Sequence, residues 1–190
     1  MDRLLEYKNK VISFNELIKG ISKQDLVSLT NEMVDRMLEQ IRTCQDEDVV
    51  FTPIDPEAMD DYGTDEEATM AWNLGHVIVH TTASSEESAF LAAELARGVE
   101  FHGRSRYELP WREMVTIAGC KKRLEDSRKM RLASLEIWPD PPHLDNTYEV
   151  WAGGRRVNAI GRFIMGLTHD IVHLGQIRDI LEQVLAERQL

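Results

Sequence analysis

The sequence contains few cysteines and no long apolar run, and each scarcity excludes a class of protein. Only Cys44 and Cys120 occur among 190 residues, without CxxC spacing, so we expect two buried or half-buried thiols and no disulfide. No stretch approaches the roughly 20 apolar residues that span a bilayer. The segment from Met1 to Lys8 has no apolar stretch of signal-peptide length. These features predict a cytoplasmic protein with no membrane partner.

Basic residues are also scarce, since 33 acidic residues stand against 22 basic ones and the formal net charge is -11. Such a chain repels a phosphate backbone, and nucleic-acid-binding proteins normally carry a basic stripe. We also find no catalytic serine motif, no phosphate-binding loop and no convincing acid and base pair of carboxylates. The sequence therefore excludes nucleic acid as a partner, favours a small-molecule substrate and leaves the catalytic residues unknown.

The chain does contain apolar residues at helical spacing, and strand signals are nearly absent. With 43% hydrophobic residues, the chain is long enough for one core, so we expect a single domain over residues 1–190. The predicted fold is all-α, an up-down-type four-helix bundle with a short additional N-terminal helix. The expected helices span about 4–17, 22–44, 65–97, 110–138 and 157–187.

Local residue signals set the predicted helix starts. Ser22 followed by Asp25 resembles a capping box, as does the later sequence Thr64-Asp65-Glu66-Glu67. Pro110 suits the first turn of the third long helix, because that position needs no backbone N–H. Between the helices, residues 45–61 read as an acidic loop, and residues 139–156 form a connection long enough to be a candidate lid.

The last predicted helix carries His169 and His173 at positions i and i+4. Their Cβ atoms would lie about 5 to 6 Å apart on one face, so both imidazoles can reach one metal ion. A catalytic site usually takes a third protein ligand and leaves a position for water or substrate. A second i, i+4 pair, His76 and His80, offers two candidates for that ligand. The metal would be divalent, and zinc, nickel, iron and manganese remain alternatives.

The helical phase of the last helix gives partial support to this hypothesis. His169 and His173 flank the main apolar stripe and do not lie at its centre. His173 shares a face with Gly166, which either leaves space for a ring, a water or a substrate, or permits close helix packing. If the histidine pair points to solvent, the metal hypothesis fails.

Two short motifs and the helix order resemble the DinB/YfiT-like superfamily, whose members are four-helix bundles with a three-histidine metal site. In that superfamily a tryptophan and a polar residue introduce a helix whose ligand histidine lies eight positions after the tryptophan. The resemblance therefore implies that this helix starts at Asn73, whereas the apparent capping box at Thr64 implies an earlier start. The final helix carries a histidine pair followed by a small residue and often Gln-Ile. The matching residues in this chain are Trp72, Asn73, His80, His169, His173, Gly175, Gln176 and Ile177.

The resemblance implies that His80, His169 and His173 bind the metal, with His76 as the rival of His80. It also implies chemistry, because members include thiol-dependent transferases and isomerases that use low-molecular-weight bacterial thiols. We therefore expect a metal-dependent transferase or hydrolase, with such a thiol as a candidate cofactor, and a homodimer because family members are often dimers. Two alternatives stay open: a non-catalytic metal-binding or sensing protein, and a purely structural dimerising bundle.

Arg155 and Arg156 are the candidate cofactor-binding residues, because cationic groups near the metal would bind the carboxylates of a thiol. The alternative, which we favour, is a solvated basic turn at the start of the last helix. Asp170, beside His169, either accepts a hydrogen bond from an imidazole or is a solvated carboxylate. We favour the solvated carboxylate.

We expect the remaining polar candidates to lie on the protein surface. The acidic pair Glu86 and Glu87 is expected to form a solvated helix face. His102 and His143 lie in predicted turn regions, where exposed loop histidines are the expectation.

Overall fold

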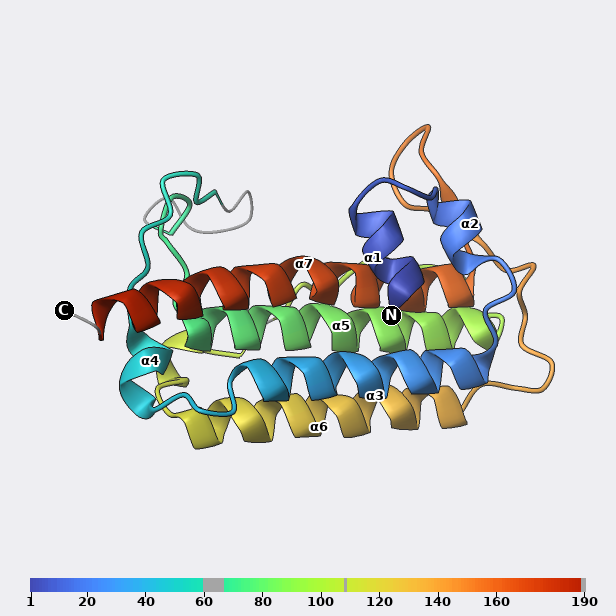
Figure 1. The fold of residues 1–190 in the computed structure, drawn as a ribbon. Coiled ribbons are helices and arrows are strands. Elements are labelled where there is room, and N and C mark those ends of the chain that lie inside the picture. The colour runs from blue at the N-terminus through green and yellow to red at the C-terminus, as the bar shows by residue number, and fades with distance from the viewer. Residues whose placement is uncertain (60–66, 108, 189–190) are drawn as a thin grey trace.

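The computed structural model describes residues 1–59, 67–107 and 109–188, and it is mostly helical (Figure 1). Four of its helices are long: α3 (Lys23–Gln40), α5 (Leu74–Ala96), α6 (Ile117–Glu136) and α7 (Ala159–Glu187). The short helices are α1 (Asp2–Lys8), α2 (Phe14–Ile18), α4 (Asp46–Val50) and the 3-10 helix η1 (Trp111–Glu113). Strands β1 (Tyr148–Glu149) and β2 (Arg156–Val157) pair antiparallel, with Tyr148 opposite Val157. The all-α prediction is confirmed.

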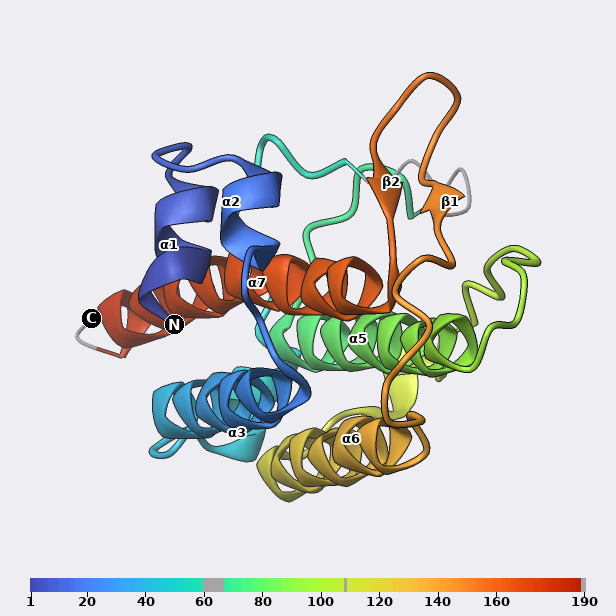
Figure 2. The same ribbon diagram turned by 90° about the vertical axis from the view of Figure 1, so that its right-hand side faces the viewer.

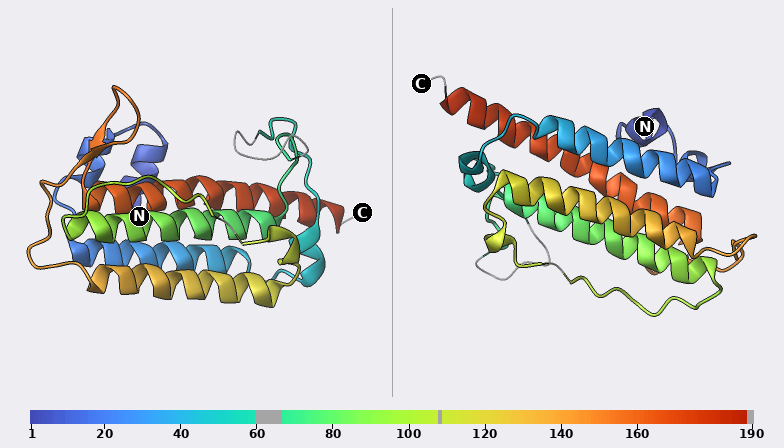
Figure 3. Two further views of the ribbon diagram at one scale, coloured as in Figure 1. Left: turned by 180° about the vertical axis from the view of Figure 1, so that it is seen from behind. Right: turned by 90° about the horizontal axis from the view of Figure 1, so that it is seen from below.

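The four long helices pack into a bundle in which α5 contacts α6 and α7, and α3 contacts the same two helices. Figures 1 and 2 show that α3 and α7 run in one direction, whereas α5 and α6 run in the other. Simple up-down alternation is therefore not observed, because α5 and α6 are sequential and parallel. The described parts of their connection, residues 97–107 and 109–116, return along the outside of the bundle (Figure 3). We call this connection the crossover segment.

Apolar side chains at helical spacing fill the space between these helices. Met33 and Met37 of α3, Val77 of α5 and Ile164 and Ile171 of α7 are almost completely buried in one continuous core. Helices α1 and α2 pack on the outer side of α7 (Figure 2). None of the helices in the described ranges combines the length and apolar character needed to cross a membrane.

Helix α3 begins as the sequence predicts. The Ser22 hydroxyl accepts a hydrogen bond from the Asp25 backbone N–H, and the Asp25 carboxylate accepts one from the Ser22 backbone N–H. This reciprocal capping box satisfies two N–H groups that the first helical turn cannot pair internally. Helix α3 ends at Gln40, four residues before the expected end.

Two other predicted helix starts are wrong. Residues 67–73 are not helical, and α5 begins at Leu74, because the Asn73 side chain caps it by accepting a hydrogen bond from the His76 backbone N–H at 2.9 Å. The capping box expected at Thr64 falls largely at residues 64–66, outside the described residues. Pro110 opens only the 3-10 turn η1, and α6 begins at Ile117 after the N-cap Thr116.

Two predicted connections also contain more structure than expected. The segment predicted as one helix over residues 4–17 is two helices, because Ser13 starts a second capping box with Glu16. Helix α4 occupies the first part of the predicted acidic loop, and residues 60–61 of that loop lie outside the described ranges. The candidate lid contains the small β1–β2 hairpin.

Candidate metal centre

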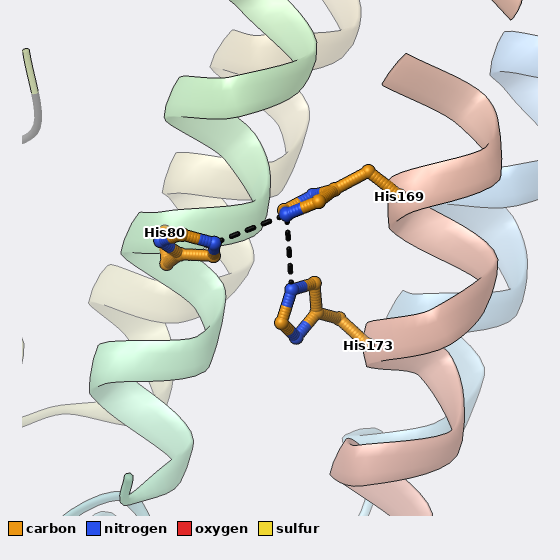
Figure 4. Close-up of side chains that lie close together, drawn as sticks. All are labelled: His80, His169 and His173. Atoms are coloured by element: carbon orange, nitrogen blue, oxygen red, sulfur yellow. Dashed lines mark hydrogen bonds between the residues drawn. The ribbon is translucent and has the colours of Figure 1, made fainter. Parts of the chain in front are cut away.

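Three imidazoles meet between α5 and α7. His80 extends from α5, and His169 and His173 extend from α7 toward it (Figure 4). The Nε2 atom of His169 lies 3.1 Å from Nε2 of His80 and 3.2 Å from Nε2 of His173. All three rings are partly buried, and their ligand atoms lie within 4.8 Å of one another. The histidine pair on α7 therefore does not point away from the bundle, although it lies at the edge of the buried stripe.

Close packing of α5 on α7 positions these side chains. A Cβ atom at Gly166 would lie 2.8 Å from Cβ of Ser88 and 3.3 Å from Cα of Ser85, so only glycine fits this approach. Gly166 precedes His173 by seven residues and therefore lies about two helical turns from it. Of the two interpretations of Gly166, the structure supports close helix packing.

Hydrogen bonding orients His173. Its Nδ1 atom donates to Oε1 of Gln176 at 2.7 Å, since a carbonyl oxygen can only accept. The proton therefore resides on Nδ1, and the Nε2 lone pair faces His169. A protein group that fixes an imidazole in this way is typical of the second layer around bound metals.

His169 is held in its neutral form. Burial, together with the neighbouring imidazoles of His173 and His80, lowers the pKa of His169 from 6.5 to about 2. Neutral imidazole is the form that binds a metal ion. His169 thus keeps a metal-binding lone pair available throughout the physiological pH range.

The contacts between the three rings are those expected of shared metal ligands. A single Nε2 atom carries either one proton or one lone pair in the ring plane, so Nε2 of His169 cannot satisfy both of its neighbours by hydrogen bonding. Among the described residues, Nδ1 of His169 also finds no hydrogen-bond partner. Two nitrogens bound to one ion at about 2.0 to 2.1 Å lie about 2.9 to 3.4 Å apart. The observed separations fit that range.

His76, the rival of His80, lies outside this cluster. Its ring is buried between two indoles, with centroids 4.3 Å from Trp72 and 4.5 Å from Trp111. Trp72 also contacts two rings of the cluster, at 4.6 Å from His80 and 5.9 Å from His173. The stacked rings therefore join η1 and the crossover segment to the candidate metal centre.

The prediction that Asp170 is solvated is wrong, because its side chain is only 1% exposed. One carboxylate oxygen accepts hydrogen bonds from the Thr81 hydroxyl at 2.8 Å and the Ser85 hydroxyl at 2.5 Å. The other accepts from Nη1 of Arg131 at 2.6 Å, and Arg131 is itself buried. Asp170 therefore joins α5, α6 and α7 beneath His169.

The expected solvated pair on α5 is also largely covered. Glu86 is buried and forms an ion pair with Arg123 of α6, with a closest N–O distance of 2.7 Å. Glu87 is paired with Arg104 of the crossover segment. Burial opposes ionisation of Glu87, but hydrogen bonds from the Arg106 backbone and from Arg104 outweigh it and hold the pKa of Glu87 below its usual value.

Arg155 and Arg156 lie outside the histidine cluster. The Arg155 guanidinium stands 4.3 Å from the centroid of the Phe14 ring, and Arg156 is exposed and donates to Thr147. Both residues precede α7, whose first residue lies ten positions before His169, so about 15 Å of helix separates them from the cluster. Their cofactor-binding role stays a prediction. His102 and His143 are exposed, as expected.

Sequence reasoning did not identify the parts played by two side chains. The hydrogen bond from His173 to Gln176 had an available signal, because positions i and i+3 are neighbours on a helix. Arg131 had none, since nothing in the sequence of α6 indicates that this guanidinium faces Asp170 on α7.

A cavity of about 480 Å³ adjoins the histidine cluster. Its lining includes Trp72 and Gln176, which both contact rings of the cluster, together with Lys8 of α1 and Asp55. Small-molecule sites typically enclose about 300 to 1,000 Å³. None of the three histidines lines this cavity, which is connected to the cluster through Trp72 and Gln176.

Comparison with known proteins agrees with this geometry. The family model described as DinB superfamily matches residues 25–177, a span that includes all three clustered histidines. No significant match is found among curated proteins or among solved structures. The superfamily is metal-binding. Since the match covers most of the sequence, the chain belongs to the DinB superfamily.

Proposed function

We propose that this protein is a metal-dependent enzyme whose divalent ion is held by His80, His169 and His173. The observation that supports the proposal is the convergence of three Nε2 atoms, at 3.1 and 3.2 Å, in a pattern that hydrogen bonding alone cannot satisfy. Three neutral ligands would leave the ion its full positive charge, and partial exposure leaves room for water or substrate. When bound, such an ion lowers the pKa of a coordinated water or thiol and polarises a carbonyl group.

The chain itself performs the positioning. Gln176 accepts the Nδ1 proton of His173 and so directs the opposite lone pair into the site. The indole of Trp72 covers one side of His80 and His173, which limits the approach of bulk water from that side. The neighbouring 480 Å³ cavity would hold the substrate.

Within this class, we propose a thiol-dependent transferase or a hydrolase. Both reactions need an activated nucleophile beside an electrophile, and both match a site with neutral ligands and open positions. The thiol assignment rests on membership of the superfamily, with Arg155 and Arg156 as its proposed partners. The metal is zinc, nickel, iron or manganese. The homodimeric state and the cytoplasmic location stay predictions from the sequence.

The decisive experiment is metal analysis of tag-free protein. We expect bound transition metal after purification, and an increase in melting temperature when zinc, nickel or manganese is added to metal-free protein, because a ligand of the native state stabilises it. His80→Ala, His169→Ala and His173→Ala should each abolish that increase. His102→Ala and His143→Ala, which change exposed histidines, are the matched controls.

Retention of less than about a tenth of an equivalent of any metal, with no thermal shift, would eliminate both the enzyme and the sensing alternative. A structural dimerising bundle would then be the remaining candidate. To separate an enzyme from a sensor, metal-loaded protein should be assayed with a panel of bacterial thiols and with hydrolysable esters and amides. Metal binding without turnover of any substrate would favour the sensor.

A further inference from the structure

A second and larger cavity, of about 690 Å³, lies between the crossover segment, α5 and α6. The crossover segment is attached to α5 at several points, through Arg104 to Glu87 and His102 to Glu94, so the cavity has a defined roof. Figure 3 shows this segment following the length of the bundle from behind. The three clustered histidines do not line this cavity, although Ala83, three residues after His80, does.

Exposed apolar side chains gather at this cavity. Phe90, Tyr107, Leu109 and Met130 line it and are between 39% and 71% exposed. Isolated exposed apolar residues are normal, but several around one concave surface indicate a binding site. The two aromatic rings come from different elements, Phe90 from α5 and Tyr107 from the crossover segment.

One carboxylate at the cavity, that of Glu94, has no guanidinium partner in the described part of the chain. Among the described residues that line the cavity, Glu86 is paired with Arg123 and Glu87 with Arg104, and Arg162 of α7 also lies 3.9 Å from Glu87. Glu94 is instead hydrogen-bonded to the imidazole of His102 at 2.8 Å.

Glu94 follows Phe90 by one helical turn, so their Cβ atoms lie about 5 to 6 Å apart on the same face of α5. A carboxylate without a guanidinium partner, beside an aromatic side chain, can recognise an ammonium group, because both the charge and the ring quadrupole attract a cation. The apolar side chains of Leu109 and Met130 would contact the rest of the ligand.

We propose that this cavity binds a small organic cation, with an ammonium group near Glu94 and Phe90 and an apolar or aromatic body beneath the crossover segment. The proposal does not depend on metal binding, because none of the clustered histidines lines the cavity. An anionic ligand would meet the carboxylate of Glu94 without a compensating guanidinium.

The test compares three probes that share a phenyl ring and differ in charge: benzyltrimethylammonium, benzyl alcohol and benzoate. Their dissociation constants for metal-free protein are measured by ligand-observed NMR titration. We expect the ammonium probe to bind about tenfold more tightly than the alcohol, which is the range of a cation–π contact assisted by a carboxylate, and benzoate to bind most weakly. Benzoate binding as tightly as the ammonium probe, or no saturable binding, would overturn the proposal.

Variants locate the site. Ala83→Trp fills the cavity and should abolish binding, whereas Ala186→Trp, at an exposed position near the end of α7, should not. Glu94→Gln should weaken the ammonium probe severalfold and leave benzyl alcohol unchanged. His169→Ala should keep ammonium binding, so a failure of the metal hypothesis and a failure of this one give different results.

Unchanged binding in Ala83→Trp would place the cation elsewhere and contradict the proposal. Circular dichroism spectra of each variant are the control for correct folding. Weaker probe binding at higher protein concentration would identify a second copy of the chain as the occupant, and would overturn the small-molecule assignment.

Discussion

His169 and Asp170 are adjacent in the chain, but the hydrogen bonding of their side chains differs. Asp170 faces inward, where the side chains of Thr81, Ser85 and Arg131 complete its hydrogen bonding. His169 faces the outer edge of the bundle, where its Nε2 meets two other Nε2 atoms and its Nδ1 has no partner in the described part of the chain. The Asp170 carboxylate therefore holds helices together, whereas the three converging Nε2 atoms are where a metal ion would bind.

The largest expected effect on stability concerns the buried carboxylate of Asp170. Arg131→Ala leaves the Asp170 carboxylate buried without its cation, and we expect a loss of about 3 to 5 kcal/mol in the free energy of unfolding. Urea denaturation of metal-free protein measures it. The paired variant Arg131→Met with Asp170→Leu should be less destabilised than Arg131→Ala alone. A loss below about 1 kcal/mol in Arg131→Ala would show that the ion pair between Arg131 and Asp170 has no structural role.

The next largest expected effect concerns the metal affinity of the histidine cluster. Gln176→Leu removes the acceptor that orients His173, so metal affinity should fall by about 10- to 100-fold while the stability of metal-free protein changes little. Isothermal titration with zinc or nickel measures the affinity. Gln24→Leu, on the exposed side of α3, is the matched control. Equal affinities in the wild type and Gln176→Leu would show that the hydrogen bond is incidental.

The stability of the metal-free protein should also depend on pH through His169. Burial and the adjacent imidazoles lower its folded-state pKa to about 2 from 6.5. Between these values the unfolded chain binds one more proton, so stability is retained above pH 6.5 and is lost as pH falls, by up to about 1.4 kcal/mol per pH unit. Urea unfolding of the wild type and His169→Gln, between about pH 6.5 and 5, isolates this contribution. Identical slopes in the two proteins would contradict it.

The smallest expected effect concerns an exposed ion pair on the same helix. Arg178 is 61% exposed and contacts Asp179 at 2.8 Å. Arg178→Ala should nevertheless change the free energy of unfolding by less than about 0.5 kcal/mol, because solvent already screens the pair. A thermal unfolding scan is sufficient. An effect as large as that of Arg131→Ala would mean that burial does not explain the difference between the two arginines.

The sequence predicted the parts of the fold that depend on local contacts. Ser22 and Asp25 form a capping box within three residues, and the i, i+4 spacing of His169 and His173 follows from helix geometry alone. Acidic residues that resembled a cap placed the start of α5 too early, whereas the resemblance to the superfamily placed it at Asn73, which is the observed N-cap. The parallel arrangement of α5 and α6 was also missed, since a long connection permits either direction.

The features that the sequence could not predict depend on partners from other helices. Asp170 and Glu86 look like surface carboxylates in their own helices, and only Arg131 and Arg123 of α6 explain their burial. The spacing left His76 and His80 as equal candidates. Stacking between Trp72 and Trp111 holds His76 outside the cluster, and Trp111 lies on a segment whose path along α5 cannot be read from spacing.

The separation of His80 and His169 along the chain, 89 residues, also has a consequence in time. At a synthesis rate of about 5 to 20 residues per second, His169 emerges roughly 4 to 18 seconds after His80. During that interval His80, Thr81 and Ser85 of α5 lack their partners on α7, because α7 has not yet been synthesised. The complete three-histidine site therefore forms only after α7 has been synthesised and has packed against α5.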